Sequence, residues 1–129
     1  MEPFSVLLVD DETDFLRTIM KRLSKRGIHA TGATSGEEAI AMLAESPRDV
    51  VVLDVKMPGM DGLTLLRRIK AAWPETEIIM LTGHASIESA MEGMACGAMD
   101  YLMKPADFED LIYKLEDAVR KKRLRTASA

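Results

Sequence analysis

Short apolar runs recur along the chain at fairly even intervals, and more polar segments separate them. The runs are rich in Val, Ile, Leu or Met and comprise Ser5–Val9, Ile28–Gly32, Val50–Leu53, Ile78–Leu81 and Tyr101–Met103. The first, third and fourth runs are continuous rather than alternating, which is typical of strands covered on both faces. The pattern therefore predicts five β-strands in a largely buried sheet.

The segments between the runs carry apolar residues at helical spacing, together with start and stop signals. Ser35 and Glu38 form a capping box for the second segment, while Gly27 is suited to end the first. Trp73-Pro74 ends the third helix, and Asp107 can cap the fifth. The apolar residues that mark these helices are Phe15, Ile19, Met20, Leu23, Ala39, Ile40, Leu43, Leu63, Leu66, Ile69, Ile87, Ala90, Met91, Met94, Leu111, Leu115 and Ala118.

Strands and helices thus alternate along the whole chain, which predicts an α/β fold with a single doubly wound parallel sheet. Parallel strands joined by helices need right-handed crossovers, and these place helices on both faces of the sheet in three layers. Ligands bind such sheets beyond the carboxyl ends of the strands. We expect one domain over residues 1–122 and a basic C-terminal tail, or the start of a linker, over 123–129.

Composition narrows the class of protein. The chain has 129 residues, of which 47% are hydrophobic and 29% charged, as in a soluble globular domain. The net charge of -4 gives no general attraction to nucleic acid or to an anionic membrane. The single cysteine, Cys96, favours a reducing, cytoplasmic setting. No apolar run approaches the ~20 residues of a membrane span, and the N-terminus lacks the basic region of a signal peptide.

Polar residues stand where four of the predicted strands end: Asp10-Asp11, Asp54, Thr82 and Lys104. If the strand order is 2-1-3-4-5, the three carboxylates converge. Two like charges ~4 Å apart repel by about 4 kcal/mol at an effective dielectric constant of about 20, so such a cluster predicts a bound cation. Mg²⁺ suits a site made only of oxygen atoms. Each aspartate alone also has an ordinary explanation, as a helix cap or a turn residue.

Lys104 and Thr82 extend this set of groups. The amine of Lys104 can pair with a carboxylate or with an added phosphoryl group, and the hydroxyl of Thr82 can donate to the same group. Taken singly, Lys104 is explained as an exposed lysine in a turn and Thr82 as a β-branched strand residue. Taken together, the groups suit a Mg²⁺-assisted phosphoryl transfer onto a carboxylate.

Four segments of the chain resemble the receiver domain of bacterial two-component response regulators. They are Val6-Leu7-Leu8-Val9-Asp10-Asp11-Glu12, Asp54-Val55-Lys56-Met57-Pro58-Gly59-Met60-Asp61-Gly62, Leu81-Thr82-Gly83 and Asp100-Tyr101-Leu102-Met103-Lys104-Pro105. The resemblance covers residues from about 4 to 122. It implies a flavodoxin-like (βα)5 fold with strand order 2-1-3-4-5.

The resemblance also implies the role of each acidic residue. Asp54 would be the phosphoacceptor, which takes a phosphoryl group from the phosphohistidine of a sensor histidine kinase or phosphotransfer protein. Asp11, Asp54 and the backbone carbonyl of Lys56 would bind Mg²⁺, with Asp10 contributing through water. The expected activity is a phosphorylation-activated signalling module that assists only its own phosphorylation and dephosphorylation.

Lys104 and Thr82 would contact the phosphoryl oxygens, and the peptide bond from Lys104 to Pro105 would be cis. Thr82 and Tyr101 would be the switch pair, which changes the face formed by the fourth helix, fifth strand and fifth helix. That face would control an output partner or an attached C-terminal output domain, and it is a possible homodimer surface. It would include Met91, Met94 and Met99, although plain core packing is the more ordinary explanation for any one of these methionines.

Several residues stay open. The resemblance implies that Lys56 and His84 lie at positions that tune the lifetime of the phosphoryl group, while a side chain exposed to solvent is the ordinary explanation for each. His29 and Cys96 have no ligand-like partners. The basic run Arg120–Arg125 suits a solvated helix end or a linker, and direct nucleic-acid binding by this domain is not expected.

The alternative from another class is a phosphatase that forms an aspartyl phosphate on a related sheet. The haloacid-dehalogenase pattern requires a second Asp two residues after the nucleophile, to act as general acid. Lys56 stands there instead, which disfavours the enzyme.

Overall fold

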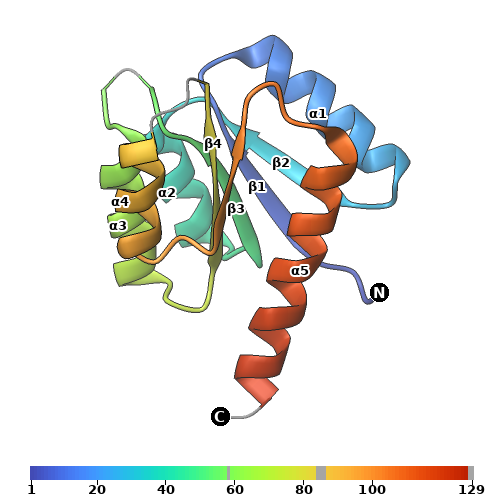
Figure 1. Cartoon of the computed structure of the whole chain (residues 1–129). Coiled ribbons are helices and arrows are strands. Elements are labelled where there is room, and N and C mark those ends of the chain that lie inside the picture. Colours follow the sequence, from blue (N-terminus) through green and yellow to red (C-terminus); the bar gives the residue numbers. More distant parts are fainter. Residues whose placement is uncertain (58, 84–86, 128–129) are drawn as a thin grey trace.

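The computed structural model describes residues 1–57, 59–83 and 87–127, and strands alternate with helices throughout these ranges (Figure 1). The strands are β1 (Ser5–Val9), β2 (His29–Ala33), β3 (Val50–Asp54), β4 (Glu77–Thr82) and β5 (Asp100–Met103). The helices are α1 (Thr13–Lys25), α2 (Gly36–Glu45), α3 (Gly62–Ala72), α4 (Ile87–Ala95) and α5 (Phe108–Ala127). None of the helices in these ranges is long and apolar enough to cross a bilayer.

All strand pairs are parallel, and their order is β2-β1-β3-β4-β5. This confirms the doubly wound sheet and the predicted strand order. Successive side chains of a strand point to opposite faces. In β1, Val6 and Leu8 join the core beneath α1 and α5, whereas Leu7 and Val9 join the core beneath α2 and α3. Because helices cover both faces of the sheet, β1 is apolar at successive positions and does not alternate between apolar and polar residues.

The ends of the central strands lie one residue beyond their predicted limits. Asp54 pairs in register with Leu81, and Thr82 pairs with Met103. The polar side chains of Asp54 and Thr82 are therefore held by the sheet rather than by a loop. β2 begins at His29, one residue later than predicted.

The predicted helix signals are confirmed, with one difference. The hydroxyl of Ser35 accepts the backbone N–H of Glu38 at 3.1 Å, as expected of a capping box. The carboxylate of Glu38 accepts from Thr34 at 2.8 Å instead of from Ser35, so the box closes one residue earlier. Gly27 has φ 77° at the end of α1, and Asp107 accepts the N–H of Glu109 at 2.8 Å.

Two methionines of α4 do not pack in the core. The exposed fraction is 66% for Met91 and 41% for Met94, so core packing is wrong for both. Tyr101 and Met103 on the edge strand β5 are also exposed. Of the three α4 side chains Ala90, Met91 and Met94, Ala90 is the buried one, with 6% exposed.

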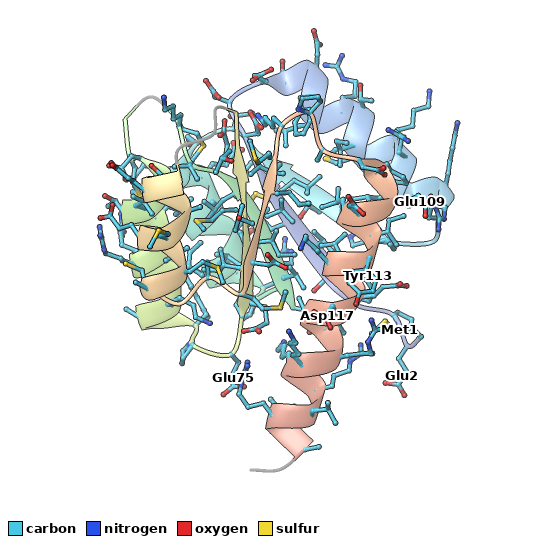
Figure 2. The ribbon with its side chains drawn as sticks, in the orientation of Figure 1. Met1, Glu2, Glu75, Glu109, Tyr113 and Asp117 are labelled. Atoms are coloured by element: carbon cyan, nitrogen blue, oxygen red, sulfur yellow. The ribbon has the colours of Figure 1, made fainter. Side chains whose placement is uncertain are left out.

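The basic run near the C-terminus belongs to α5, which continues through residues 123–127 without a break. Two of its side chains reach the amino ends of β3 and β4. Figure 2 shows α5 running past this end of the sheet. The contacts are Lys122 with Asp49 (2.7 Å), Arg125 with Glu77 (3.4 Å), and Arg123 with the backbone carbonyls of Glu2 (3.2 Å) and Pro3 (2.8 Å). Most of this basic charge is therefore used within the domain.

Candidate functional site

Three of the predicted site residues converge at the carboxyl ends of neighbouring strands. Asp10 directly follows β1, Asp54 ends β3 and Thr82 ends β4. Their exposed fractions are 1%, 5% and 5%, unusually low for polar side chains. Sheet order explains their proximity, since β1, β3 and β4 are consecutive in the sheet.

Asp11 completes an acidic cluster with Asp10 and Asp54. One carboxylate oxygen from each residue lies within 4.8 Å of the others. Asp11 is exposed, so the cluster opens to solvent on that side. Three hard oxygen donors at this spacing, with room for water, fit Mg²⁺ as the sequence predicted.

Lys104 lies against this cluster, as predicted. Its ammonium is 2.6 Å from Oδ2 of Asp10, 3.5 Å from Oδ2 of Asp54 and 3.5 Å from Oε1 of Glu12. The backbone N–H of Lys104 donates to the carbonyl of Thr82 at 2.8 Å, which ties the ends of β4 and β5 together. The peptide bond to Pro105 is cis, as the resemblance implied.

Burial and charge set the ionisation of this site. Burial raises the pKa of Asp54 above its ordinary value of 3.8, and the charge of Asp10 adds to the rise, while Lys104 and the N–H of Lys56 partly offset it. For Lys104, burial alone would lower the pKa, but the hydrogen bond to Asp10 and the nearby carboxylates outweigh it and raise the pKa above 10.5. Lys104 thus stays positively charged, while burial disfavours the charged form of the neighbouring Asp54.

The start of α3 fixes the backbone around Asp54. The N–H of Gly62 donates to the carbonyl of Val55 at 2.9 Å, and a Cβ on Gly62 would lie 2.5 Å from the Cα of Val55. Only glycine permits this approach. Asp61 caps the helix by accepting the N–H of Thr64 at 2.8 Å. Oδ1 of Asp54 accepts the N–H of Lys56 at 3.2 Å.

The two predicted switch residues differ in exposure. Thr82 is buried at the end of β4, whereas 41% of Tyr101 on β5 is exposed. A Cβ on Gly83, the residue after Thr82, would meet open space. Lys56 is exposed, and His84 lies outside the described residues.

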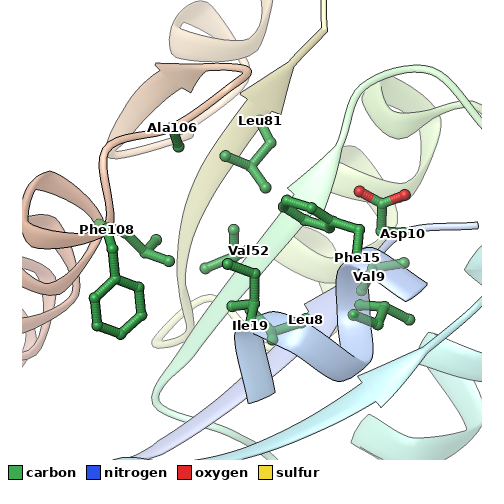
Figure 3. Close-up of a pocket in the computed structure, with 11 residues that line it drawn as sticks. Leu8, Val9, Asp10, Phe15, Ile19, Val52, Leu81, Ala106 and Phe108 are labelled. Atoms are coloured by element: carbon green, nitrogen blue, oxygen red, sulfur yellow. The ribbon is translucent and has the colours of Figure 1, made fainter. Parts of the chain in front are cut away.

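An apolar pocket of about 20 Å³ lies beneath the site, between the sheet, α1 and the start of α5 (Figure 3). The residues that line it are Leu8, Val9, Asp10, Phe15, Leu16, Ile19, Val52, Leu81, Ala106, Phe108 and Leu111. A pocket of this size holds about one water molecule and excludes a nucleotide. A larger ligand would therefore have to bind on the solvent-exposed side of the site, next to the acidic cluster.

Glu12 and Phe15 are the neighbours of Lys104 that the sequence did not single out. Glu12 had a visible signal, since it directly follows the acidic pair. The sequence marked Phe15 only as one of several apolar residues at helical spacing. Its ring centroid lies 4.6 Å from the Lys104 ammonium.

Comparisons with known proteins agree with this geometry. The family model of the response regulator receiver domain matches residues 6–116. The chain is 39% identical over 114 residues to the transcriptional regulatory protein ZraR of Salmonella typhimurium, covering 88% of this chain and 26% of that protein. It is 36% identical over 114 residues to the DNA-binding transcriptional regulator NtrC of the same organism, covering 88% and 24%. The chain thus spans about a quarter of the length of these relatives.

Solved structures give the same result. A response regulator receiver domain protein from Clostridium thermocellum superposes with a TM-score of 0.89 at 35% identity, covering 94% of this chain and 98% of that one. NtrX from Brucella abortus superposes with a TM-score of 0.92 at 32% identity, covering 98% of this chain and 29% of that one. Fold, strand-end residues and relatives therefore agree, and the chain belongs to the response regulator receiver domain family.

Proposed function

We propose that the chain accepts a phosphoryl group on Asp54 from the phosphohistidine of a sensor histidine kinase or a phosphotransfer protein. A carboxylate oxygen of Asp54 attacks the phosphorus atom, the P–N bond to the imidazole breaks, and an aspartyl phosphate forms. The observation that carries the proposal is the position of Asp54, buried among Asp10, Asp11 and the Lys104 ammonium.

The same cluster supports Mg²⁺ as the cofactor. Asp10, Asp11 and Asp54 would hold the ion, and the backbone carbonyl of Lys56 is the remaining proposed ligand. The bound cation would supply charge neutralisation at the phosphoryl oxygens. Lys104 adds a second positive charge next to Asp10 and Asp54, and this charge would offset part of the repulsion between the carboxylates and the incoming phosphoryl group.

Phosphorylation would then act as a switch. It adds about -1.5 to -2 units of charge and three strong acceptor oxygens. Thr82 and Lys104 would receive them, and Tyr101 would turn inward behind Thr82. The responding face is α4–β5–α5, where Met91, Met94 and Tyr101 are exposed and available to an output partner or to a second copy of the chain.

The relatives support a proposal for the setting of this module. They are longer regulators, so a C-terminal output domain is the proposed target of the switch. We place the module in the bacterial cytoplasm, with no direct nucleic-acid contact by the receiver itself. The basic run gives such contact no support, because Lys122 and Arg125 pair with Asp49 and Glu77.

The phosphatase alternative has no support in the site. The general acid it needs is replaced by Lys56, whose side chain is exposed. We therefore propose a module that assists only its own phosphorylation and dephosphorylation.

Intact mass spectrometry tests the proposal. The protein is incubated with a small acyl phosphate, with Mg²⁺ or with EDTA. We expect wild type to gain the mass of one phosphoryl group only when Mg²⁺ is present. Equal gain with EDTA, or no gain under either condition, contradicts the proposed function.

A further inference from the structure

An aromatic ring lies directly beside the ammonium group at the site. The ring centroid of Phe15, on the first turn of α1, is 4.6 Å from Nζ of Lys104. This is within the ~6 Å at which the face of a ring attracts a cation. Phe15 is partly buried, and Figure 3 shows it on the same side of the small apolar pocket as Asp10.

The other neighbours of this ammonium are carboxylates. Two of them, Asp10 and Asp54, belong to the acidic cluster and would share their charge with a cation bound there. The third, Glu12, has 67% of its side chain exposed, so solvent screens its attraction. Phe15 differs because the attraction of its ring does not depend on the charge of the cluster.

We propose that Phe15 is a positioning residue for Lys104 in phosphoryl transfer to Asp54. This inference rests on the proposed function. A lysine has a flexible four-carbon stem, and its ammonium must be near Asp54 before the phosphoryl group arrives. The Phe15 ring closes the α1 side of the site and keeps the ammonium at the carboxylates. Phe15 thus acts through Lys104 and not on the phosphoryl group.

The test compares initial rates of phosphorylation by a small acyl phosphate in the presence of Mg²⁺. Phe15→Leu keeps an apolar side chain but removes the ring, and we expect about a threefold to tenfold slower rate. Phe15→Tyr keeps a ring and should retain most of the rate. Ile19→Val alters packing one turn further along α1, in the same pocket, and should leave the rate unchanged.

A double-mutant cycle separates positioning from general packing. In a Lys104→Met background, Phe15→Leu should have no further effect, because the group it positions is gone. A second readout needs no phosphoryl donor. In wild type, the ring current of Phe15 should shift the NMR signals of the Lys104 methylene next to the ammonium, and Phe15→Leu should abolish that shift.

The outcomes are distinct. If wild type takes up no phosphoryl group, the proposed function fails and this inference fails with it. If wild type reacts and Phe15→Leu reacts equally fast, only the positioning role is overturned. The same holds if Phe15→Leu slows the reaction by the same factor in the Lys104→Met background as in wild type. Absence of a ring-current shift at Lys104 overturns it as well.

Discussion

Lys104 and Asp10 are separated by 94 positions in the sequence, yet Nζ of Lys104 lies 2.6 Å from Oδ2 of Asp10. The pair joins the end of β5 to the end of β1, across β3 and β4. The lysine cation partly neutralises carboxylates that would otherwise repel one another. Its ammonium therefore shares the carboxylates of Asp10 and Asp54 with the Mg²⁺ ion proposed to bind there.

Removing the ammonium of Lys104 should change both the stability of the protein and the effect of Mg²⁺ on its melting temperature. Lys104→Met leaves Asp10 and Asp54 buried without a positive partner, and we expect the metal-free protein to lose about 1–3 kcal/mol of unfolding free energy. Mg²⁺ should then raise the melting temperature of Lys104→Met by more than it raises that of wild type. Thermal unfolding with and without Mg²⁺ measures both effects.

Lys114→Met is the matched control for this prediction. It also removes a lysine from an ion pair, with Asp100, but on α5. Its response to Mg²⁺ should equal that of wild type. A smaller or equal Mg²⁺ response in Lys104→Met would show that the ammonium and the metal do not share the cluster.

Gly62 should be intolerant of a side chain. A Cβ there would meet backbone atoms of Val55 and Asp54 at 2.5–2.8 Å, and neither residue can move without displacing Asp54, the proposed phosphoacceptor. We expect Gly62→Ala to lose about 1–3 kcal/mol and to slow phosphorylation. Gly36→Ala, at the start of α2, is the control, since the three atoms nearest its Cβ all belong to the flexible side chain of Met60. Equal losses in the two variants would refute the argument.

Asp49 should contribute to the acid sensitivity of the fold. Burial alone would raise its pKa, but the hydrogen bonds from Lys122 and Ser5 outweigh burial and lower the pKa below 3.8. The stabilisation is therefore fully present above about pH 3.8 and is lost as pH falls through the lower folded-state value. Asp49→Asn should show a smaller loss of stability on acidification below this range than wild type. Denaturant unfolding at several pH values tests this, with the exposed Asp14→Asn as control.

Tyr101 should report the switch. With 3-fluorotyrosine incorporated, the chain gives two ¹⁹F signals, from Tyr101 and Tyr113. Phosphorylation should move the Tyr101 signal, because the proposed switch would bury this exposed ring near Thr82. It should move the Tyr101 signal further than that of Tyr113, which is 63% exposed on α5. In Thr82→Ala the shift should shrink, and an unchanged Tyr101 signal on phosphorylated protein would argue against the switch pair.

Much of the fold and the site could be predicted from the sequence because both depend on short-range patterns. Continuous apolar runs indicated buried strands, and strand order then placed Asp10, Asp54 and Thr82 at one edge. Lys104 could be added because it also follows a strand. These positions are set by the sheet, whose geometry is regular.

The remaining features depend on how far a helix reaches and which way it points. To predict that Lys122 pairs with Asp49, one must know that α5 extends along the sheet as far as the amino ends of its strands. To predict that Met91 is exposed, one must know how wide the buried face of α4 is. Helical spacing likewise predicted that Phe15 faces inward, but not that its ring meets Lys104.

The central claim is that Asp54 alone carries the phosphoryl group, and chemical trapping tests it most directly. After reaction with an acyl phosphate and Mg²⁺, borohydride reduces an aspartyl phosphate to homoserine, which peptide mass mapping locates. We predict homoserine at position 54 in wild type and at no position in Asp54→Asn. Homoserine at another aspartate in wild type, or an equal yield of trapped product from Asp54→Asn, would contradict the account.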